Sequence, residues 1–192
     1  MIKPLIIIGM AAAAALLLRP QSTADGTATA GDEEATTIDD AGETVKSYFS
    51  NWPTGSEPYQ ATIQQAADDN GVPASVLAWL LWKESRYNPS IIDGTKRSSV
   101  GAMGIAQFMP ATAAQELGSA QAALNPAIAI PGAARYLAKL YRTAGTWAGA
   151  LAAYNWGIGN VTRKGLDRAP AETTDYYTTI LSRANAGGST YA

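Results

Sequence analysis

The chain has 192 residues, of which 47% are hydrophobic, and a formal net charge of −2, which allows one well-packed domain but not two. It contains no cysteine and no histidine, so disulfides, thiolate or histidine zinc sites, iron–sulfur clusters and Ser-His-Asp catalysis are excluded. Any proton transfer near neutral pH must therefore come from a carboxylate, a lysine or a tyrosine.

Residues 1–20 are predicted to be a signal peptide or an N-terminal membrane anchor. A basic start at Lys3 precedes an uncharged apolar run over residues 5–18, which Arg19 and Pro20 end. This order matches the first two regions of a secretory signal. As a helix the run would be about 21 Å long, short of the ~30 Å hydrocarbon core, so a cleaved signal, a tilted anchor and a buried soluble helix all stay open. The first two place the rest of the chain outside the cytoplasm.

Residues 21–44 are predicted to be an acidic, disordered linker. The segment holds seven acidic side chains and no basic one, and Ile38 is its only large apolar residue, so it cannot bury enough surface to offset its ordering entropy. The remaining 148 residues carry 12 basic and nine acidic side chains, a net charge of +3, which favours contact with anionic polymers. No basic run with interleaved aromatic residues indicates binding to nucleic acid.

Residues 45–192 are predicted to form one all-helical domain. No stretch alternates apolar and polar residues for long enough to indicate a strand, while several stretches show helical spacing. The expected helices cover residues 58–69, 73–85, 111–117, 131–143, 146–156 and 173–185. A loop is expected after the second helix, because Tyr87, Asn88 and Pro89 are followed by Asp93 and Gly94.

Glu84 is the candidate catalytic residue of the second helix. It follows Leu77 by seven residues, which places it only about 20° from Leu77 around the helix, on the apolar face. Burial and the dipole of the last helical turn would both raise the pKa of its carboxyl group. A carboxylic acid that stays protonated near neutral pH is what a general acid needs. The alternative is a helix-end glutamate that pairs with Lys83 or Arg86, or that extends into water.

Two later segments combine glycines, aromatic rings and amide side chains. Residues 101–110 contain two glycines and Gln107, without the ending or the spacing of a phosphate-binding loop. Residues 153–157 place Asn155 between Tyr154 and Trp156. An asparagine in such a position can bind an acetamido or hydroxyl group while a ring covers a sugar face. Each segment alone is equally consistent with a turn that packs aromatic residues into the core.

Taken together and in this order, the segments match the pattern of a known family. The matching segments are Glu84-Ser85 and residues 101–107, 109–113, 125–126 with 132–137, 153–155 and 172–176. In these segments, which span roughly residues 57–185, the chain resembles the lytic transglycosylases of the soluble type. The resemblance implies an all-α, lysozyme-like (goose-type/SLT) helical domain with a glycan-binding cleft.

The resemblance implies three roles around the reacting bond. Glu84 would be the single catalytic acid/base. Ser85 would hydrogen-bond near the scissile sugar. Tyr176 would stand close to Glu84 and orient it.

The resemblance also implies how the glycan is held. Gln107 and the backbone around Met103 would line the glycan groove, and Tyr154 and Asn155 would bind the N-acetyl sugars. The sequence departs from the family at residues 105–106, where Ile-Ala replaces the commoner Leu-Met and Ala106 removes bulk from the groove. A second departure is Tyr177, where a small aliphatic residue is usual.

The activity implied by the resemblance is cleavage of peptidoglycan glycan strands. The β-1,4 bond between N-acetylmuramic acid and N-acetylglucosamine would be cut without water, leaving 1,6-anhydro ends. No site for a metal, nucleotide or redox cofactor is evident. The expected location is periplasmic or extracytoplasmic, with a membrane anchor through residues 5–18 if that segment is retained, and with phage, conjugation or secretion machinery (a virion, if phage-encoded) as partner.

Two alternatives stay open. A goose-type muramidase would hydrolyse the same bond and would need a water-positioning carboxylate, for which Asp93 is the candidate, although Asp-Gly is also a common turn pair. A noncatalytic wall-binding or structural module would keep the fold without the reaction.

Overall fold

The computed structural model describes residues 51–96 and 98–185, so the predicted signal or anchor at 1–20 and the linker at 21–44 lie outside the described residues. In the described ranges the chain is helical, and the one strand-like feature is an isolated antiparallel bridge between Met103 and Phe108. None of the helices in these ranges is long and apolar enough to cross a membrane.

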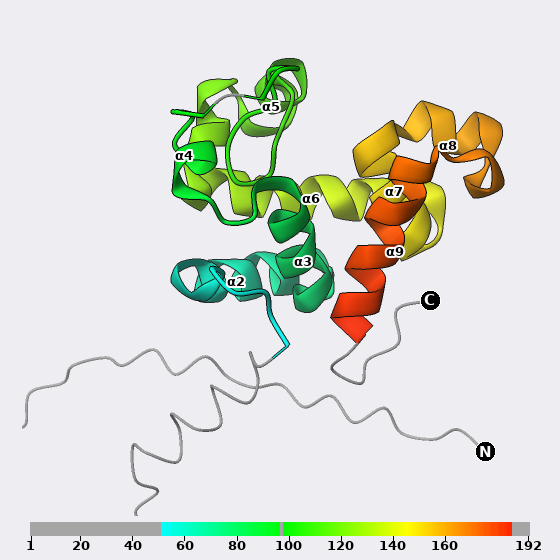
Figure 1. The fold of residues 1–192 in the computed structure, drawn as a ribbon, viewed down its shortest axis with the longest axis horizontal. Helices are drawn as coiled ribbons and strands as arrows, with labels where there is room; N and C mark the ends of the chain where they lie inside the picture. The colour runs from blue at the N-terminus through cyan, green and yellow to red at the C-terminus, as the bar shows by residue number, and fades with distance from the viewer. Residues whose placement is uncertain (1–50, 97, 186–192) are drawn as a thin grey trace, which may run out of the picture. The chain divides into compact units, whose positions relative to one another are not determined.

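Figure 1 shows the order of the helices along the chain. In chain order they are η1 Glu57–Tyr59, α2 Gln60–Asn70, α3 Ala74–Ser85, α4 Pro89–Ile92, α5 Pro110–Leu117, η2 Gln121–Leu124, α6 Pro126–Ala144, α7 Trp147–Trp156, α8 Ile158–Lys164, η3 Leu166–Arg168 and α9 Ala171–Asn185. All six helices expected from the sequence are present. The short helices α4 and α8 were not predicted, and α6 begins five residues before its expected start at Pro131.

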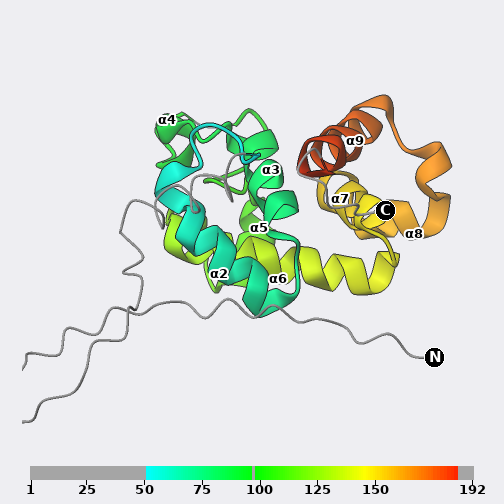
Figure 2. The same ribbon diagram turned by 90° about the horizontal axis from the view of Figure 1, so that it is seen from below.

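The central element is α6, which packs against α2, α5, α7, α8 and η2. Figure 2 shows α2 beside α6, and α9 beside α7. Small residues line the buried face of α6, where Ala129, Ala133 and Ala134 have no exposed surface. Since small side chains let helix backbones approach closely, α6 can support helices on several sides at once.

Helix α7 is buried through its middle, because Gly149 and the run Ala150-Leu151-Ala152-Ala153 are all buried. A helix that is apolar all round belongs in the interior. Thr146 caps its N-terminus by accepting a hydrogen bond from the Gly149 N–H. This fixed helix carries Tyr154 and Asn155 in its last turn.

The end of α3 is sharply defined. Arg86 and Tyr87 both adopt left-handed backbone conformations, with φ of 54° and 51°, which are uncommon for residues other than glycine. Tyr87 is held there because its hydroxyl donates to the Ala78 carbonyl at 2.8 Å and its ring stacks on Tyr59 at 5.7 Å. The chain therefore leaves α3 in one direction immediately after Glu84 and Ser85.

Candidate active site

Glu84 lies in the last turn of α3 with its side chain only partly accessible to solvent. Its Oε1 accepts a hydrogen bond from the Tyr176 hydroxyl at 2.5 Å. Burial raises the pKa of Glu84 from 4.5 to about 7, against smaller lowering effects from the Tyr176 hydrogen bond and the Lys83 charge. The direction agrees with the sequence-based prediction, and desolvation is its main cause.

Tyr176 comes from α9, the last described helix, which packs against both α3 and α7. It is 4% exposed and lies on the buried face of α9 with Thr173, Ile180 and Ala184. Burial, together with the nearby Glu84 carboxyl group, holds the pKa of Tyr176 well above 10. The phenol is therefore neutral at ordinary pH and acts as a hydrogen-bond donor to Glu84.

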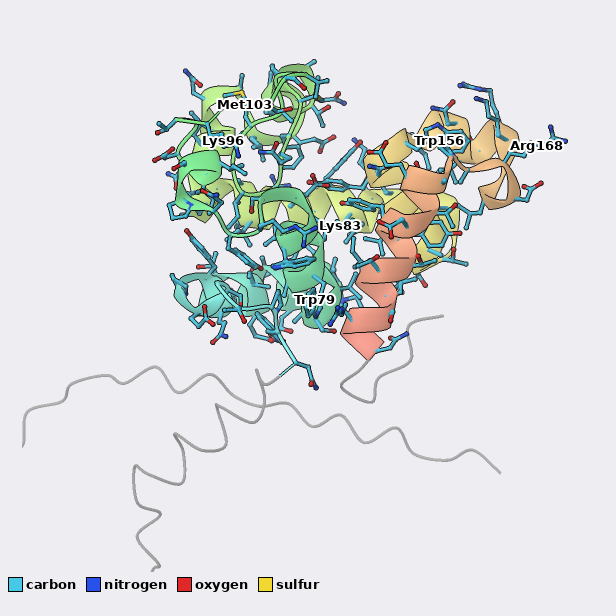
Figure 3. All side chains as sticks on the ribbon, in the orientation of Figure 1. Trp79, Lys83, Lys96, Met103, Trp156 and Arg168 are labelled. Carbon is cyan, nitrogen blue, oxygen red and sulfur yellow. The ribbon has the colours of Figure 1, made fainter. Side chains whose placement is uncertain are left out.

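The two cations nearest in sequence to Glu84 are engaged elsewhere. The Lys83 Nζ lies 2.6 Å from Asp175 Oδ2 on α9, and the Arg86 guanidinium lies 3.5 Å from the centre of the Trp82 ring. Figure 3 labels Lys83 where it extends between α3 and α9. The alternative expectation, a surface glutamate paired with Lys83 or Arg86, is not what the structure contains.

Ser85 is a correction to the sequence-based expectation. Its side chain has no exposed surface, and its hydroxyl donates to the Leu81 carbonyl at 3.0 Å while it accepts from the Tyr87 N–H at 3.2 Å. A hydroxyl that is buried and bonded in this way cannot contact a sugar. Ser85 instead closes the last turn of α3 and stabilises the left-handed residues that follow it.

Backbone hydrogen bonds between Met103 and Phe108 close the glycine-rich loop before α5. Met103 and Phe108 exchange backbone hydrogen bonds of 2.9 and 3.1 Å, so the Met103 N–H is not free to bind a ligand. Gln107 has a φ of 48°, and its side-chain Nε2 donates to the Gly104 carbonyl at 2.8 Å. Its Oε1 accepts no hydrogen bond in the described structure and remains the acceptor that Gln107 can offer a ligand.

Tyr154 joins this loop to α7. Its hydroxyl donates to the Ala106 carbonyl at 2.9 Å, and its ring packs at tilted angles against Phe108 and Tyr136. Ala106 is fully buried, so it acts here through its backbone and its small side chain does not widen an open groove as expected. Burial, and secondarily the Glu84 carboxyl group, raises the pKa of Tyr154 well above 10.

Asn155 is exposed, and a residue of α9 fixes the orientation of its side-chain amide. Its Oδ1 accepts a hydrogen bond from the hydroxyl of Thr173 at 2.8 Å, and Thr173 is 2% exposed. The carbonyl side of the amide is thereby fixed, which leaves the NH₂ group to donate to a ligand.

Helix α9 brings together three of the predicted site residues, Glu84, Asn155 and Tyr176. Residues 173–176 contact Asn155 through Thr173, Lys83 through Asp175 and Glu84 through Tyr176. Sequence reasoning assigned a role only to Tyr176 and missed Thr173 and the Lys83–Asp175 pair. Their positions in the sequence could have indicated the Lys83–Asp175 pair, since Lys83 directly precedes Glu84 and Asp175 directly precedes Tyr176.

Asp93, the candidate for a hydrolytic enzyme, is exposed in the loop after α4. Hydrogen bonding from the Thr95 side chain, and secondarily from the Thr95 N–H that Oδ1 accepts at 2.8 Å, lowers the pKa of the carboxyl group. The geometry is that of a turn-forming aspartate. Within the described residues no group of three or more acidic side chains could hold a metal ion.

Known proteins share this sequence pattern and this fold. The model of the transglycosylase SLT domain family matches residues 61–176. Peptidoglycan transglycosylase gp16 of Escherichia phage T7 is 39% identical over 109 residues, which cover 54% of this chain and 8% of that protein. The chain thus corresponds to a small part of that relative.

Two solved structures are similar over most of the described domain. The lytic transglycosylase Slt of Pseudomonas aeruginosa is 29% identical with a TM-score of 0.58, covering 68% of this chain and 24% of that one. The 70 kDa soluble lytic transglycosylase of Escherichia coli is 26% identical with a TM-score of 0.58, covering 67% and 24%. The predicted all-α fold of the SLT type is therefore confirmed. Because the family model matches more than half of its residues, this chain belongs to the transglycosylase SLT domain family.

Proposed function

We propose that this chain is a lytic transglycosylase that cleaves the β-1,4 bond between N-acetylmuramic acid and N-acetylglucosamine in peptidoglycan. The observation that carries the proposal is the pairing of Glu84, whose pKa burial raises to about 7, with the buried hydroxyl of Tyr176. Membership of the SLT family and the peptidoglycan transglycosylase activity in the name of the phage relative support the substrate class.

Glu84 acts first as an acid. Because Tyr176 donates to Oε1, Oε2 is the oxygen left to carry the transferable proton. That proton goes to the glycosidic oxygen as its bond to C1 of the muramic sugar breaks. The N-acetylglucosamine side leaves as an alcohol, and positive charge develops at C1 and the ring oxygen.

Glu84 then acts as a base. Its carboxylate takes the proton from the C6 hydroxyl of the same muramic sugar, and O6 forms a new bond to C1. The product is a 1,6-anhydro ring, no water is consumed, and Glu84 is again protonated. The attack is fast because the nucleophile belongs to the substrate ring and is already held near C1.

One carboxyl group is sufficient for this sequence of steps. Ordinary glycosidases use a second carboxylate as nucleophile or to activate water, whereas here the substrate supplies both the nucleophile and an acetamido group that can stabilise the cationic transition state. In the described structure the hydrogen-bond partner of Glu84 is a tyrosine, and Asp93 is engaged in a turn. This arrangement favours transglycosylation over hydrolysis.

The remaining site residues would hold the glycan. The NH₂ group of Asn155 and the Oε1 of Gln107 can bond the acetamido groups of the sugars, while Tyr154 supports the loop that carries Gln107. One of the similar structures, from Pseudomonas aeruginosa, is an inactive mutant with glutamine in place of a glutamate. A single glutamate is thus essential in that protein, as we propose for Glu84.

Action on peptidoglycan requires an extracytoplasmic location, and residues 5–18 would provide the export signal or the membrane anchor. The phage relative makes association with a virion the favoured context. Fractionation of cells that produce the full chain or a variant lacking residues 5–18 tests the export role. The deletion should leave the protein in the cytoplasm, and unchanged export would contradict it.

The activity is tested by mass spectrometry of the muropeptides that the purified full chain releases from sacculi, beside Glu84→Gln. Wild type should release anhydro-muropeptides and Glu84→Gln none, because the amide keeps the shape but cannot donate the proton. Glu172→Gln is the matched control, since Glu172 is an exposed glutamate in the first turn of α9, and it should keep full activity.

Two outcomes would contradict the proposal. Reducing-end muropeptides would indicate hydrolysis and make Asp93→Asn the next variant to measure. Glycan binding by both wild type and Glu84→Gln with no release from either would indicate a noncatalytic wall-binding module.

A further inference from the structure

The helices α3 and α9 are joined by two parallel polar contacts between residues that are adjacent in sequence. Glu84 accepts from Tyr176 at 2.5 Å, and Lys83 contacts Asp175 at 2.6 Å. Each member of the ion pair directly precedes a member of the Glu84–Tyr176 pair. The ion pair therefore lies at the level of the carboxyl group and not elsewhere along the helices.

We infer that Lys83 and Asp175 are a positioning pair, which holds α9 against α3 so that Tyr176 meets Glu84 and which balances the charge beside that carboxyl group. The inference rests on the proposed function, in which Glu84 is the proton donor. It assigns the pair no contact with substrate.

The two members of the ion pair differ in burial. The Lys83 side chain is 17% exposed, and Asp175 is 68% exposed. The stem of Lys83 is largely covered, and its partner is held in place because Asp175 Oδ1 also accepts from the Thr179 hydroxyl at 3.3 Å. The hydrogen bond and charge of Lys83 lower the pKa of Asp175, so this carboxylate stays ionised at neutral pH.

The charges around Glu84 are few. Lys83 acts on it from α3, Tyr176 from α9 and Tyr154 from α7, and both tyrosines are neutral because burial holds their pKa values well above 10. Residues 101–109 of the loop contain no charged side chain. Asp175 faces Lys83 and is also influenced by Arg86. The Lys83 charge thus acts on Glu84 directly, and Asp175 opposes that charge as the ion-pair partner of Lys83.

Removal of the Lys83 charge and removal of the Asp175 charge should shift the pKa of Glu84 in opposite directions. Lys83→Met removes a positive charge that favours the carboxylate, so the pKa of Glu84 should rise. Asp175→Asn leaves the Lys83 charge unbalanced, so the pKa of Glu84 should fall. At these separations, partly screened by solvent, each shift should be roughly half a pH unit. A purely structural role would give loss of activity in both variants without opposed shifts.

The experiment measures two quantities on the full chain. The first is the initial rate of muropeptide release at limiting sacculi from pH 5 to pH 9, whose basic limb reports the proton on Glu84. The second is a ¹³C NMR titration of the Glu84 carboxyl carbon, assigned with Glu84→Gln, which needs no turnover. The limb and the NMR midpoint should rise in Lys83→Met, fall in Asp175→Asn, and return to the wild-type value in Lys83→Arg.

The positioning role is tested by the rate of muropeptide release at the optimum pH. Each single variant should lose roughly three- to ten-fold, and the double variant should lose no more than the worse single one, because contacting residues act as a unit. Lys139→Met is the matched control: Lys139 pairs with Glu116 at 2.8 Å between α6 and α5, so its loss should change neither the rate nor the titration. Circular dichroism and thermal unfolding confirm that each variant is folded.

The outcomes distinguish this inference from the proposed function. NMR shifts of the same sign in both single variants, or no shift in either, would overturn the inference even if wild type releases anhydro-muropeptides. Opposed NMR shifts with no release by wild type would support the electrostatic role and contradict the proposed activity instead.

Discussion

At the scale of single residues, the central feature is a carboxyl group that changes protonation near neutral pH. Glu84 is half protonated at about pH 7, since burial raises its pKa to that value. A general acid works best when its pKa lies close to the working pH, because the group then both holds and releases a proton readily. Activity should therefore fall as the pH rises above about 7.

The hydrogen bond from Tyr176 gives a second residue-level prediction. Tyr176→Phe removes the donor to Oε1, so the carboxyl group loses its orientation and its carboxylate form loses stabilisation. We expect kcat/KM to fall about 10- to 100-fold, the range of one hydrogen bond to a charged group. The basic limb of the pH profile should move upward, because this hydrogen bond lowers the pKa of Glu84.

The control for this variant is Tyr141→Phe, because the Tyr141 ring stacks on Trp147 at 4.2 Å, between α6 and α7. It should leave the rate and the limb unchanged. A Tyr176→Phe variant with wild-type rates across the whole pH range would show that the hydroxyl does not orient Glu84.

The raised pKa of Glu84 also has a consequence for stability. Its pKa is about 7 in the folded chain against 4.5 as the reference for the unfolded one. The folded state therefore binds this proton more tightly than the unfolded state. The contribution of the bound proton to the free energy of unfolding is complete below pH 4.5 and is lost as the pH rises through 7. Glu84→Gln carries no charge and avoids this loss.

We expect the free energy of unfolding of Glu84→Gln, relative to wild type, to grow by on the order of 2 kcal/mol between pH 5 and pH 8.5. Urea unfolding at the two pH values measures the difference. A difference that stays constant with pH would mean that Glu84 titrates normally in the folded protein.

At the scale of helices, the sequence predicted those with long apolar periodicity and missed those without it. The helix α3 shows the pattern clearly, with Leu77, Leu80 and Leu81 fully buried. The helices α4 and α8 have four and seven residues, too few to establish a period. The start of α6 was misplaced because Pro131 suits a first helical turn, whereas the helix begins at Pro126 with Asn125 as its cap.

The loop before α5 depends on one close approach between backbones. Gly104 has a φ of 74°, and a Cβ atom there would lie 1.7 Å from the carbonyl oxygen of Ala123 in η2. Gly104→Ala should therefore cost about 2–5 kcal/mol of stability, from the clash together with the left-handed backbone. It should also reduce activity at temperatures where the chain is still folded, because the loop carries Gln107.

The matched control is Gly101→Ala in the same loop. Gly101 has a φ of 82°, but nothing lies within 4 Å of its added Cβ. Only the backbone cost of about 1–2 kcal/mol should remain. Equal losses of unfolding free energy for the two variants would mean that the contact with Ala123 does not hold the loop.

At the scale of the whole molecule, the site is assembled from distant parts of the chain. Glu84 and Tyr176 are 92 positions apart, as are Lys83 and Asp175. Helical periodicity predicts which face of a helix is buried but not which helix covers it, so the meeting of α3 and α9 was expected only from the family resemblance. The buried state of Ser85 could not be foreseen, because it depends on the left-handed turn at Arg86 and Tyr87.

The central claim is that C1 of the muramic sugar is attacked by its own O6 and not by water. The most direct test is digestion of sacculi in ¹⁸O-labelled water. We predict that the new muramic ends released by the full chain are anhydro rings without ¹⁸O, because O6 of the sugar itself closes the bond to C1. Ends that carry ¹⁸O on a reducing sugar would contradict this claim, since water would then be the nucleophile.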